Sequence, residues 1–388
     1  MNARTTGRDG LSLALIDARN RTLRWLARFE EAGRLLGNGD GGPVPLHMAG
    51  RAGWLQEWWI VRNVRRGRAE AAPSGGLRLP GVDLRFDRCF GDGGPVPPAV
   101  DVLPGADEVR AYLQTTLEQA LDLLAGSPED DEALHVYRCA LQQEDRLAEA
   151  FAVVAQALGI EPGEAAAPNG PPPARVAREP LWMPAQRFVV GTPPGGWVPA
   201  AERWAHEEAI PEFEIDAQAV SWERFVEFAE DGGYDREDLW RPASWRWLQA
   251  QGRRAPRHVE QLRHGVLLTR FGRVCRAAAA QAAVHLSWHE ADAWCRWAGR
   301  RLPTEPEWEL AAATARSRGF VWGDVWEWVA GHARAWPGGP AVVPTHPPRR
   351  VLRGASSWTA PRVVHVRQRR FVVGERDELF CGFRSCSA

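Results

Sequence analysis

The sequence contains no lysine, so its 48 strongly basic side chains are all arginines. Without a lysine amine, the protein cannot form a Schiff base with a carbonyl substrate or use lysine as a general base. The 49 acidic residues balance the arginines to a formal net charge of -1. Such a balance does not indicate the positive field that would attract nucleic acid or an acidic membrane surface. We therefore expect neither as a partner.

Paired cysteines and long apolar runs are also missing. The six cysteines are scattered and form no C-x-x-C pair, a pattern typical of reduced thiols rather than of a disulfide framework. No run of 18 or more apolar residues marks a membrane span, and the first residues lack the apolar stretch of a signal peptide. The glycine-rich GDGGP (91–95) is not followed by a helix with Lys-Ser/Thr, which a phosphate loop requires. We expect a cytoplasmic protein.

The first part of the chain has the pattern of a helical domain. Apolar residues recur at helical spacing over 11–36, 46–64, 105–126 and 130–159, and acids open the last two segments. A long irregular stretch, 67–104, separates the second helix from the third. Four helices with one long crossover predict a four-helix bundle over residues 1–160.

The second part of the chain has a different texture. A linker rich in Pro, Ala and Gly covers 161–178. Beyond it, short apolar runs such as RFVVG (187–191), FEID (213–216) and VLRGAS (351–356) alternate with turns. Two amphipathic helices are predicted, over 221–230 and over 288–299, the second between Ser287 and Gly299 as caps. Residues 179–388 are therefore expected to form an α+β domain.

Several motifs in this domain resemble the formylglycine-generating-enzyme fold, a C-type-lectin-like α+β fold also known from sulfatase-modifying factors. They lie in the right order over about 200 residues, and their tryptophans are expected mostly to pack. They are VSWERFVEFAEDGGY (220–234), HLSWHEADAWCRWAGRRLPTEPEWELAA (285–312), WGDVWEWVAG (322–331), VLRGAS (351–356) and GFRSC (382–386).

Two segments of the first half narrow the resemblance. VPLHMAGRAGWLQEWWIVRN (44–63) and ALQQEDRLAEAF (140–151) resemble the two metal-binding stretches of EgtB and SenA proteins, the ergothioneine and selenoneine synthases. That family fuses a DinB-like helical bundle to a formylglycine-enzyme-like domain. FVEFAEDGGY and WGDVWEW look closest to the SenA branch. The resemblance implies that sulfur or selenium is joined to C2 of the hercynine imidazole with a mononuclear non-heme iron and O2.

The residues at the implied ligand positions do not suit iron. The family uses three imidazoles, and the matching positions here hold Arg51, Gln143 and Leu147. Arg has no lone pair for a metal, Leu has no donor atom, and a single amide oxygen is a weak ligand. We therefore expect no iron cofactor.

A site displaced by one helical turn is the alternative at this position. It would use His47, His135 and Cys139, which are otherwise ordinary helix residues.

The implied substrate side has changed as well. Arg370 stands where the family has an asparagine that helps to hold hercynine, and no tyrosine follows Tyr234, although the family mechanism takes a proton donor from a tyrosine of the second domain. We expect the ligand to be a hercynine-like betaine or an anionic metabolite, with Glu149 and Asp377 as candidate partners of the arginines. The substrate-pocket residues implied by the resemblance are Arg51, Gln143, Arg146, Leu147, Arg369, Arg370 and Phe371.

Two other metal chemistries and two functions remain open. Cys381 and Cys386 have the five-residue spacing of a copper-dependent formylglycine-forming pair, but they sit in the terminal strand rather than before it. His285 and His289, at i and i+4, are expected to pack. The protein is then either a selenoneine- or ergothioneine-synthase-like enzyme with an unorthodox iron site, or an iron-free relative that acts as a binding or regulatory protein.

Overall fold

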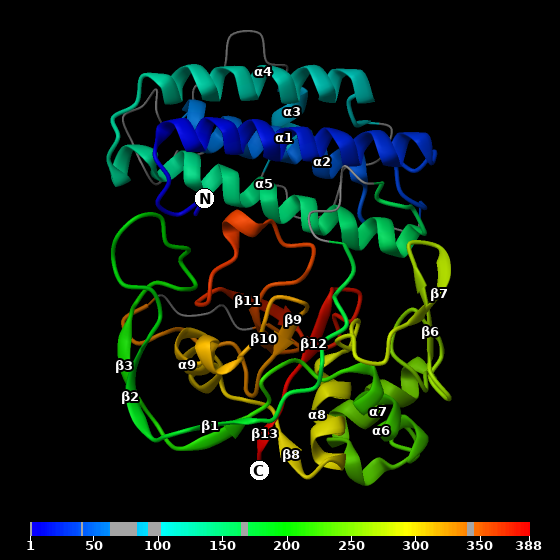
Figure 1. Ribbon diagram of the computed structural model, residues 1–388. Helices are drawn as coiled ribbons and strands as arrows, with labels where there is room; N and C mark the ends of the chain where they lie inside the picture. The colour runs from blue at the N-terminus through cyan, green and yellow to red at the C-terminus, as the bar shows by residue number, and fades with distance from the viewer. Residues whose placement is uncertain (1, 40–41, 63–83, 92–101, 164–169, 340–344) are drawn as a thin grey trace. The chain divides into compact units, whose positions relative to one another are not determined.

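The computed structural model describes residues 2–39, 42–62, 84–91, 102–163, 170–339 and 345–388 (Figure 1). The chain forms two compact units. Unit 1 comprises Met1–Pro168 with the short segments Gly195–Trp197 and Thr359–Val363, and unit 2 comprises the remaining residues. Within the described ranges, the helices are too short or too polar to cross a membrane.

Unit 1 is helical, as the sequence predicts. Four long helices and one short one carry it: α1 (Arg8–Glu31), α2 (Pro45–Gln56), α3 (Leu84–Phe90), α4 (Ala106–Ala125) and α5 (Asp131–Leu158). Figure 1 shows α1, α4 and α5 running side by side. Their apolar faces, with Leu11, Leu15, Leu134 and Leu141 at the centre, form a core that also takes in Ala360 and Val363 from the second short segment.

Capping residues set the bounds of α5. The Asp130 side chain accepts a hydrogen bond from the Ala133 amide at 2.8 Å, and Gly159 ends the helix in the left-handed region at φ 69°. The helix agrees with the span and the acidic start that the sequence predicts for 130–159, and the two caps explain where it begins and ends. The helix predicted over 46–64 is less regular, because α2 continues as a π-helical segment, η1 (Glu57–Arg62).

Unit 2 combines short strands with helices, which confirms the predicted α+β class. Two four-stranded sheets have the orders β1-β4-β13-β8 and β11-β10-β9-β12, and β2-β3 and β5-β6-β7 form smaller antiparallel sheets. β9 and β12 pair in parallel, while the other pairs are antiparallel. The strands are β1 (Leu181–Met183), β2 (Gln186–Val190), β3 (His206–Ile210), β4 (Phe213–Ile215), β5 (Val259–Gln261), β6 (Val266–Arg270), β7 (Arg273–Ala277), β8 (Arg300–Arg301), β9 (Trp326–Trp328), β10 (Arg349–Gly354), β11 (Arg369–Val373), β12 (Cys381–Phe383) and β13 (Cys386–Ser387).

The helices of unit 2 include two that the sequence pattern does not predict. The expected pair is found as α6 (Trp222–Glu230) and α8 (Trp288–Trp297), and the additional ones are α7 (Pro242–Gln251) and α9 (Glu305–Thr314). In α9 the acids Glu305, Glu307 and Glu309 are buried together with the apolar residues, so the sequence shows no apolar stripe at helical spacing. Short 3₁₀ turns of unit 2 lie at η3 (Glu237–Leu239) and η4 (Arg316–Arg318), whereas η5 (Pro361–Val363) belongs to the second short segment of unit 1.

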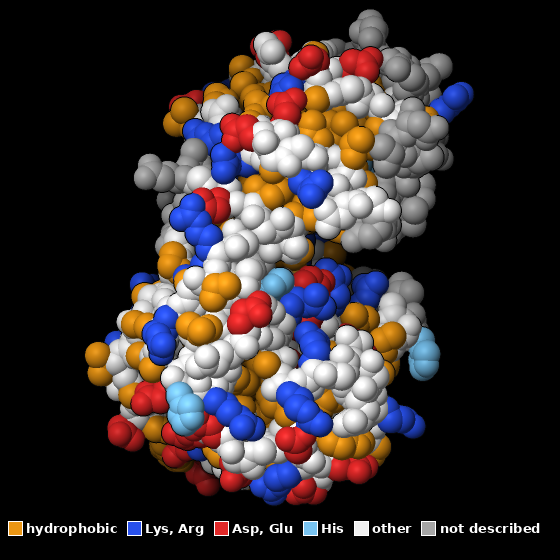
Figure 2. All heavy atoms as spheres, turned by 90° about the vertical axis from the view of Figure 1, so that its right-hand side faces the viewer, with side chains coloured by type: hydrophobic (Ala, Val, Ile, Leu, Met, Phe, Trp, Pro, Cys, Tyr) orange, Lys and Arg blue, Asp and Glu red, His pale blue; other side chains and the backbone are white. Residues whose placement is uncertain are grey.

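The motif tryptophans pack, as the sequence predicts. Trp288, Trp308, Trp326 and Trp328 are at most 2% exposed, and Trp297 is half-buried. The Trp308 indole donates to Glu327 at 2.8 Å, and the Trp328 indole donates to the Leu286 carbonyl at 2.7 Å. These side chains therefore build the core of unit 2. The face of unit 2 seen in Figure 2 mixes acidic and basic side chains without a broad patch of one sign.

Candidate functional site

Arg51, at the first implied ligand position, binds the C-terminal end of α3. Its Nη1 donates to the carbonyls of Phe90 at 2.7 Å and Gly91 at 3.2 Å. A cation is favourable there, since the last carbonyls of a helix lack partners and carry partial negative charge. The two helices approach closely because residue 50 is glycine: a Cβ at Gly50 would lie 2.2 Å from the Phe90 ring. Arg51 therefore ties α2 to α3.

The two remaining implied positions share one face of α5. Gln143 and Leu147 stand four residues apart on an unbroken helix, so their side chains project on the same side. Gln143 is exposed and Leu147 is half-buried, while Arg146 between them is exposed. The helix thus presents an amide and an aliphatic side chain where the family is expected to present two imidazoles.

Glu144 and Asp145, which lie between Gln143 and Leu147 on α5, are buried within unit 1. Glu144 is buried and accepts from Arg19 Nε at 2.7 Å and from Thr22 at 3.0 Å, and Arg19 also donates to Gln56 at 2.6 Å. This network was not predicted from the sequence. A signal for it exists, because Arg19 and Thr22 interrupt the apolar face of the first helix at core spacing.

A distant segment pairs with Asp145. Arg362 donates to both carboxylate oxygens of Asp145, at 2.8 and 2.7 Å, and to Asp17 at 2.6 Å. Burial raises the pKa of Asp145, although the neighbouring Arg362 cation opposes this. In the same segment, the Thr359 hydroxyl donates to Glu149 at 3.1 Å. Glu149, a predicted partner of the pocket arginines, therefore has at least this other donor.

The donor set does not fit the implied iron. An imidazole or carboxylate at each position would supply lone pairs, but Arg51, Gln143 and Leu147 offer one amide oxygen among them. Across the described ranges, there is also no group of three or more His, Cys, Asp and Glu side chains that could hold a metal ion.

The candidates for a displaced metal site, His47, His135 and Cys139, lie within these described ranges. His47 is buried, its Nε2 lies 2.9 Å from the Cys89 carbonyl, and its pKa is lowered chiefly by burial. His135 and Cys139 are half-buried on α5. The structure therefore does not bring these three side chains together as a metal site.

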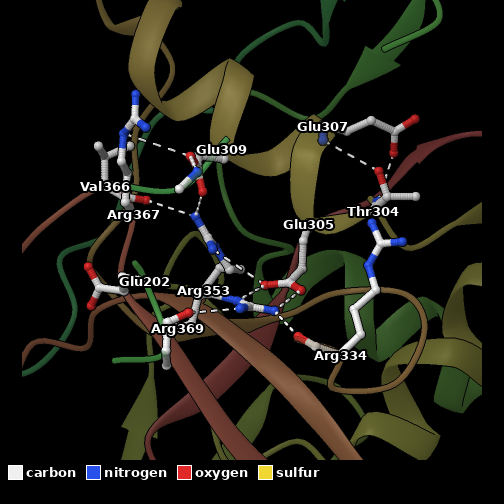
Figure 3. A network of polar contacts seen from close by, with 12 residues as sticks. Glu202, Thr304, Glu305, Glu307, Glu309, Arg334, Arg353, Val366, Arg367 and Arg369 are labelled. Atoms are coloured by element: carbon white, nitrogen blue, oxygen red, sulfur yellow. Dashed lines mark hydrogen bonds and ion pairs between the residues drawn. The ribbon is translucent and has the colours of Figure 1, made fainter. Parts of the chain in front are cut away.

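Arg369, in unit 2, is held by an internal ion pair (Figure 3). It lies directly opposite Arg353 across β10 and β11, and both side chains reach Glu305 or Glu309 of α9. Arg369 forms a two-pronged pair with Glu305 at 2.8 Å for each bond and donates to the carbonyls of Ala201 and Arg334, also at 2.8 Å. It is 3% exposed. Arg369 therefore serves the structure of unit 2 rather than a free anion.

The other two predicted pocket residues of unit 2, Arg370 and Phe371, are less buried than Arg369. The Arg370 guanidinium lies 5.8 Å from the Trp326 ring centroid, and Phe371 is half-buried against the core of unit 2. The predicted partner Asp377 binds Arg253 at 2.5 Å and Arg257 at 2.6 Å. Tyr234 is buried and donates to Glu290 at 2.7 Å, and burial raises its pKa well above the ordinary value. It is therefore a poor proton donor for a substrate.

The cysteine and histidine alternatives have structural explanations. Cys381 and Cys386 lie on different sheets, β12 and β13, and burial raises the pKa of both thiols. His289 Nδ1 lies 2.7 Å from the Ser244 hydroxyl, and His285 is buried. Apart from Gly91, the GDGGP segment lies outside the described residues.

The chain is similar to proteins of two kinds. Residues 168–324 match the model of the sulfatase-modifying factor enzyme 1-like domain. A formylglycine-generating enzyme from Streptomyces coelicolor is 32% identical over 45% of this chain and 58% of its own length. A solved structure, Treponema denticola variable protein 1, aligns at 15% identity with a TM-score of 0.28 over 54% of this chain and 94% of its own, too low for an argument.

Longer matches cover both units. A hercynine oxygenase from Mycolicibacterium smegmatis is 30% identical over 99% of this chain and 99% of its own length. A hercynine oxygenase from Mycobacterium tuberculosis is 29% identical over 98% of this chain and 99% of its own length. The helical unit and the α+β unit therefore match together and in order, and this chain belongs to the hercynine oxygenase family.

Proposed function

We propose that this protein binds a hercynine-like betaine without iron and does not catalyse the oxygenation for which its relatives are named. The proposal rests on the contacts of Arg51. At the first implied ligand position, a guanidinium is committed to the last carbonyls of α3, so the substitution is integrated into the packing of unit 1. Gln143 and Leu147 remove the other two imidazoles. A binding or regulatory role fits these residues better than catalysis.

The choice of a betaine over an anionic ligand follows from the partners of the arginines. Arg51 and Arg369 already have acceptors in their own units. The Glu305 carboxylate balances the Arg369 charge, and Arg51 Nη1 is directed at the end of α3, which leaves less of either group for a carboxylate or phosphate. Arg370 in place of asparagine is expected to weaken the affinity for a trimethylammonium group relative to catalytic relatives, because like charges repel.

Two measurements test this proposal. The first is calorimetric titration with hercynine in the presence of a metal chelator, where we expect saturable binding. The second is product analysis with excess ferrous iron, O2 and a sulfur or selenium donor, where we expect neither a C–S nor a C–Se product. Turnover with either donor would refute the proposal and assign the chain to the corresponding synthase branch.

A restored variant tests the placement of the ligand positions. The triple change Arg51→His, Gln143→His and Leu147→His puts three imidazoles on α2 and α5, two of them at i and i+4. We expect this variant to bind ferrous iron, while Arg51→Ala alone does not. A folded triple variant that fails to bind iron would mean that these positions do not correspond to the family's ligands.

A further inference from the structure

Unit 2 contains a stacked arginine that takes no part in the ion pairs described above. The Arg350 guanidinium of β10 lies 3.6 Å from the centroid of the Trp288 ring, at the start of α8. The ring is fixed, since Trp288 is 2% exposed and its indole donates to the Val329 carbonyl at 3.1 Å. Arg350 Nη1 donates to the Gly331 carbonyl at 2.9 Å. Stacking and one hydrogen bond therefore hold the guanidinium in place while it is half-buried.

Arg350 forms no ion pair with a carboxylate of the described residues. Two carboxylates act on it from a distance and raise its pKa. Asp292 binds Arg241 through two bonds of 2.8 and 2.9 Å, and Glu375 lies 3.6 Å from His289 Nε2 and keeps one buried oxygen without a hydrogen-bond partner among the described residues. Other arginines of unit 2 with little exposure differ in this respect, because Arg353 pairs with Glu309 and Arg384 with Glu327. A half-buried cation without such a partner is costly unless an anion compensates it.

The neighbouring charges sharpen this imbalance. Arg241 lies 5.5 Å from the same Trp288 ring. Burial and the Arg241 cation lower the pKa of Arg350 to about 10. His332 does not add a full charge at neutral pH, since burial and the two arginines lower its pKa.

A histidine beside Arg350 offers a further polar atom. Gly374 lies next to both side chains, since a Cβ at this glycine would be 3.5 Å from Arg350 Cγ and 3.6 Å from His289 Nε2. His289 is only 9% exposed, and its Nε2 forms no hydrogen bond with the described residues, since Glu375 Oε1 lies 3.6 Å away. Ser244, 2% exposed, lies against the opposite ring nitrogen and so fixes the ring rather than acting as a nucleophile.

We propose that Arg350, stacked on Trp288, binds the carboxylate of a small monoanionic ligand. A guanidinium edge matches the two oxygens of a carboxylate, which can accept two parallel hydrogen bonds. A single negative charge also matches the surroundings, because Asp292 and Glu375 would repel a phosphate dianion more strongly than a carboxylate. This site is independent of the iron question.

The test is a titration of the full-length protein with acetate, butanoate and inorganic phosphate at constant ionic strength, followed by calorimetry and thermal unfolding. We expect saturable binding of the carboxylates and at least tenfold weaker binding of phosphate. Arg350→Gln should weaken carboxylate binding at least tenfold. Arg350→Lys keeps the charge but loses the two-pronged geometry, so it should also bind more weakly than the native protein.

Arg187→Gln is the matched control, because Arg187 is exposed and pairs with Glu207 at 2.8 Å. It should bind carboxylates like the native protein. Three outcomes would overturn the site: no saturable carboxylate binding, equal binding by folded Arg350→Gln or Arg350→Lys, or phosphate binding as tight as carboxylate binding. If Arg350→Gln does not fold, the lysine variant alone decides.

Discussion

At the scale of single residues, arginines that the family resemblance places at a substrate site have structural partners. Arg51 binds the carbonyls of Phe90 and Gly91, and Arg369 binds Glu305. The substitutions can be recognised in the sequence, because the residues on either side of them match the motifs of the family. Their partners could not, since those partners lie 39, 40 and 64 residues away along the chain and no local pattern connects such positions.

The Glu305–Arg369 pair gives a prediction for stability. Glu305→Gln would leave Arg353 and Arg369 buried with one carboxylate fewer, and breaking a buried pair by removing one partner costs about 3–5 kcal/mol. Urea unfolding measures the loss. Glu207→Gln is the control, since its pair with Arg187 is exposed and should contribute less than about 1 kcal/mol. Equal, small losses in the two variants would contradict a structural role for Arg369.

At the scale of elements, local signals predicted the amphipathic helices α6 and α8 but missed α7 and α9. α5 and α8 have side-chain caps at Asp130 and Ser287, which the sequence reveals. α9 also begins with a capping box, at Thr304, but the buried acids Glu305, Glu307 and Glu309 alternate with its apolar residues and remove the amphipathic period. α3 lies within a stretch rich in Gly and Pro that indicates irregular structure.

Two histidines flank the β5-β6-β7 sheet and give a prediction for pH dependence. His258 precedes β5, His285 follows β7, and their ring centroids lie 4.9 Å apart. Burial lowers the pKa of His258 to about 4 and that of His285 to about 3, both from 6.5. The charged groups that act on His258 are Arg253, Arg257, Glu260 and Asp377.

Because both folded-state pKa values lie below the unfolded value, the unfolded chain binds more protons between pH 6.5 and about 4. Stability should therefore be complete above pH 6.5 and fall as the pH decreases to 5. His258→Gln cannot titrate, so it should reduce this fall by about 1–2 kcal/mol. Urea unfolding at pH 7 and pH 5 provides the comparison, and an unchanged fall in the variant would show that His258 is not buried in its neutral form.

At the scale of the whole molecule, the order of the helical and the α+β unit could be predicted from the sequence. Which segments of the chain belong to each unit could not. Near residue 160 the sequence pattern changes from apolar residues at helical spacing to short apolar runs separated by turns. The relatives match both halves in order. The inclusion of Thr359–Val363 in unit 1 depends on Arg362, Asp17 and Asp145. Arg362 lies 217 positions from Asp145 and 345 from Asp17, so only the folded chain reveals their pairing.

We propose that this member of the hercynine oxygenase family has kept the fold and does not hold iron. The direct measurement is the iron content of protein incubated anaerobically with excess ferrous iron and then desalted, with a hercynine oxygenase relative treated in parallel. Arg51, Gln143 and Leu147 predict less than about a tenth of an equivalent of retained iron. About one equivalent, held with micromolar or tighter affinity, would contradict the claim.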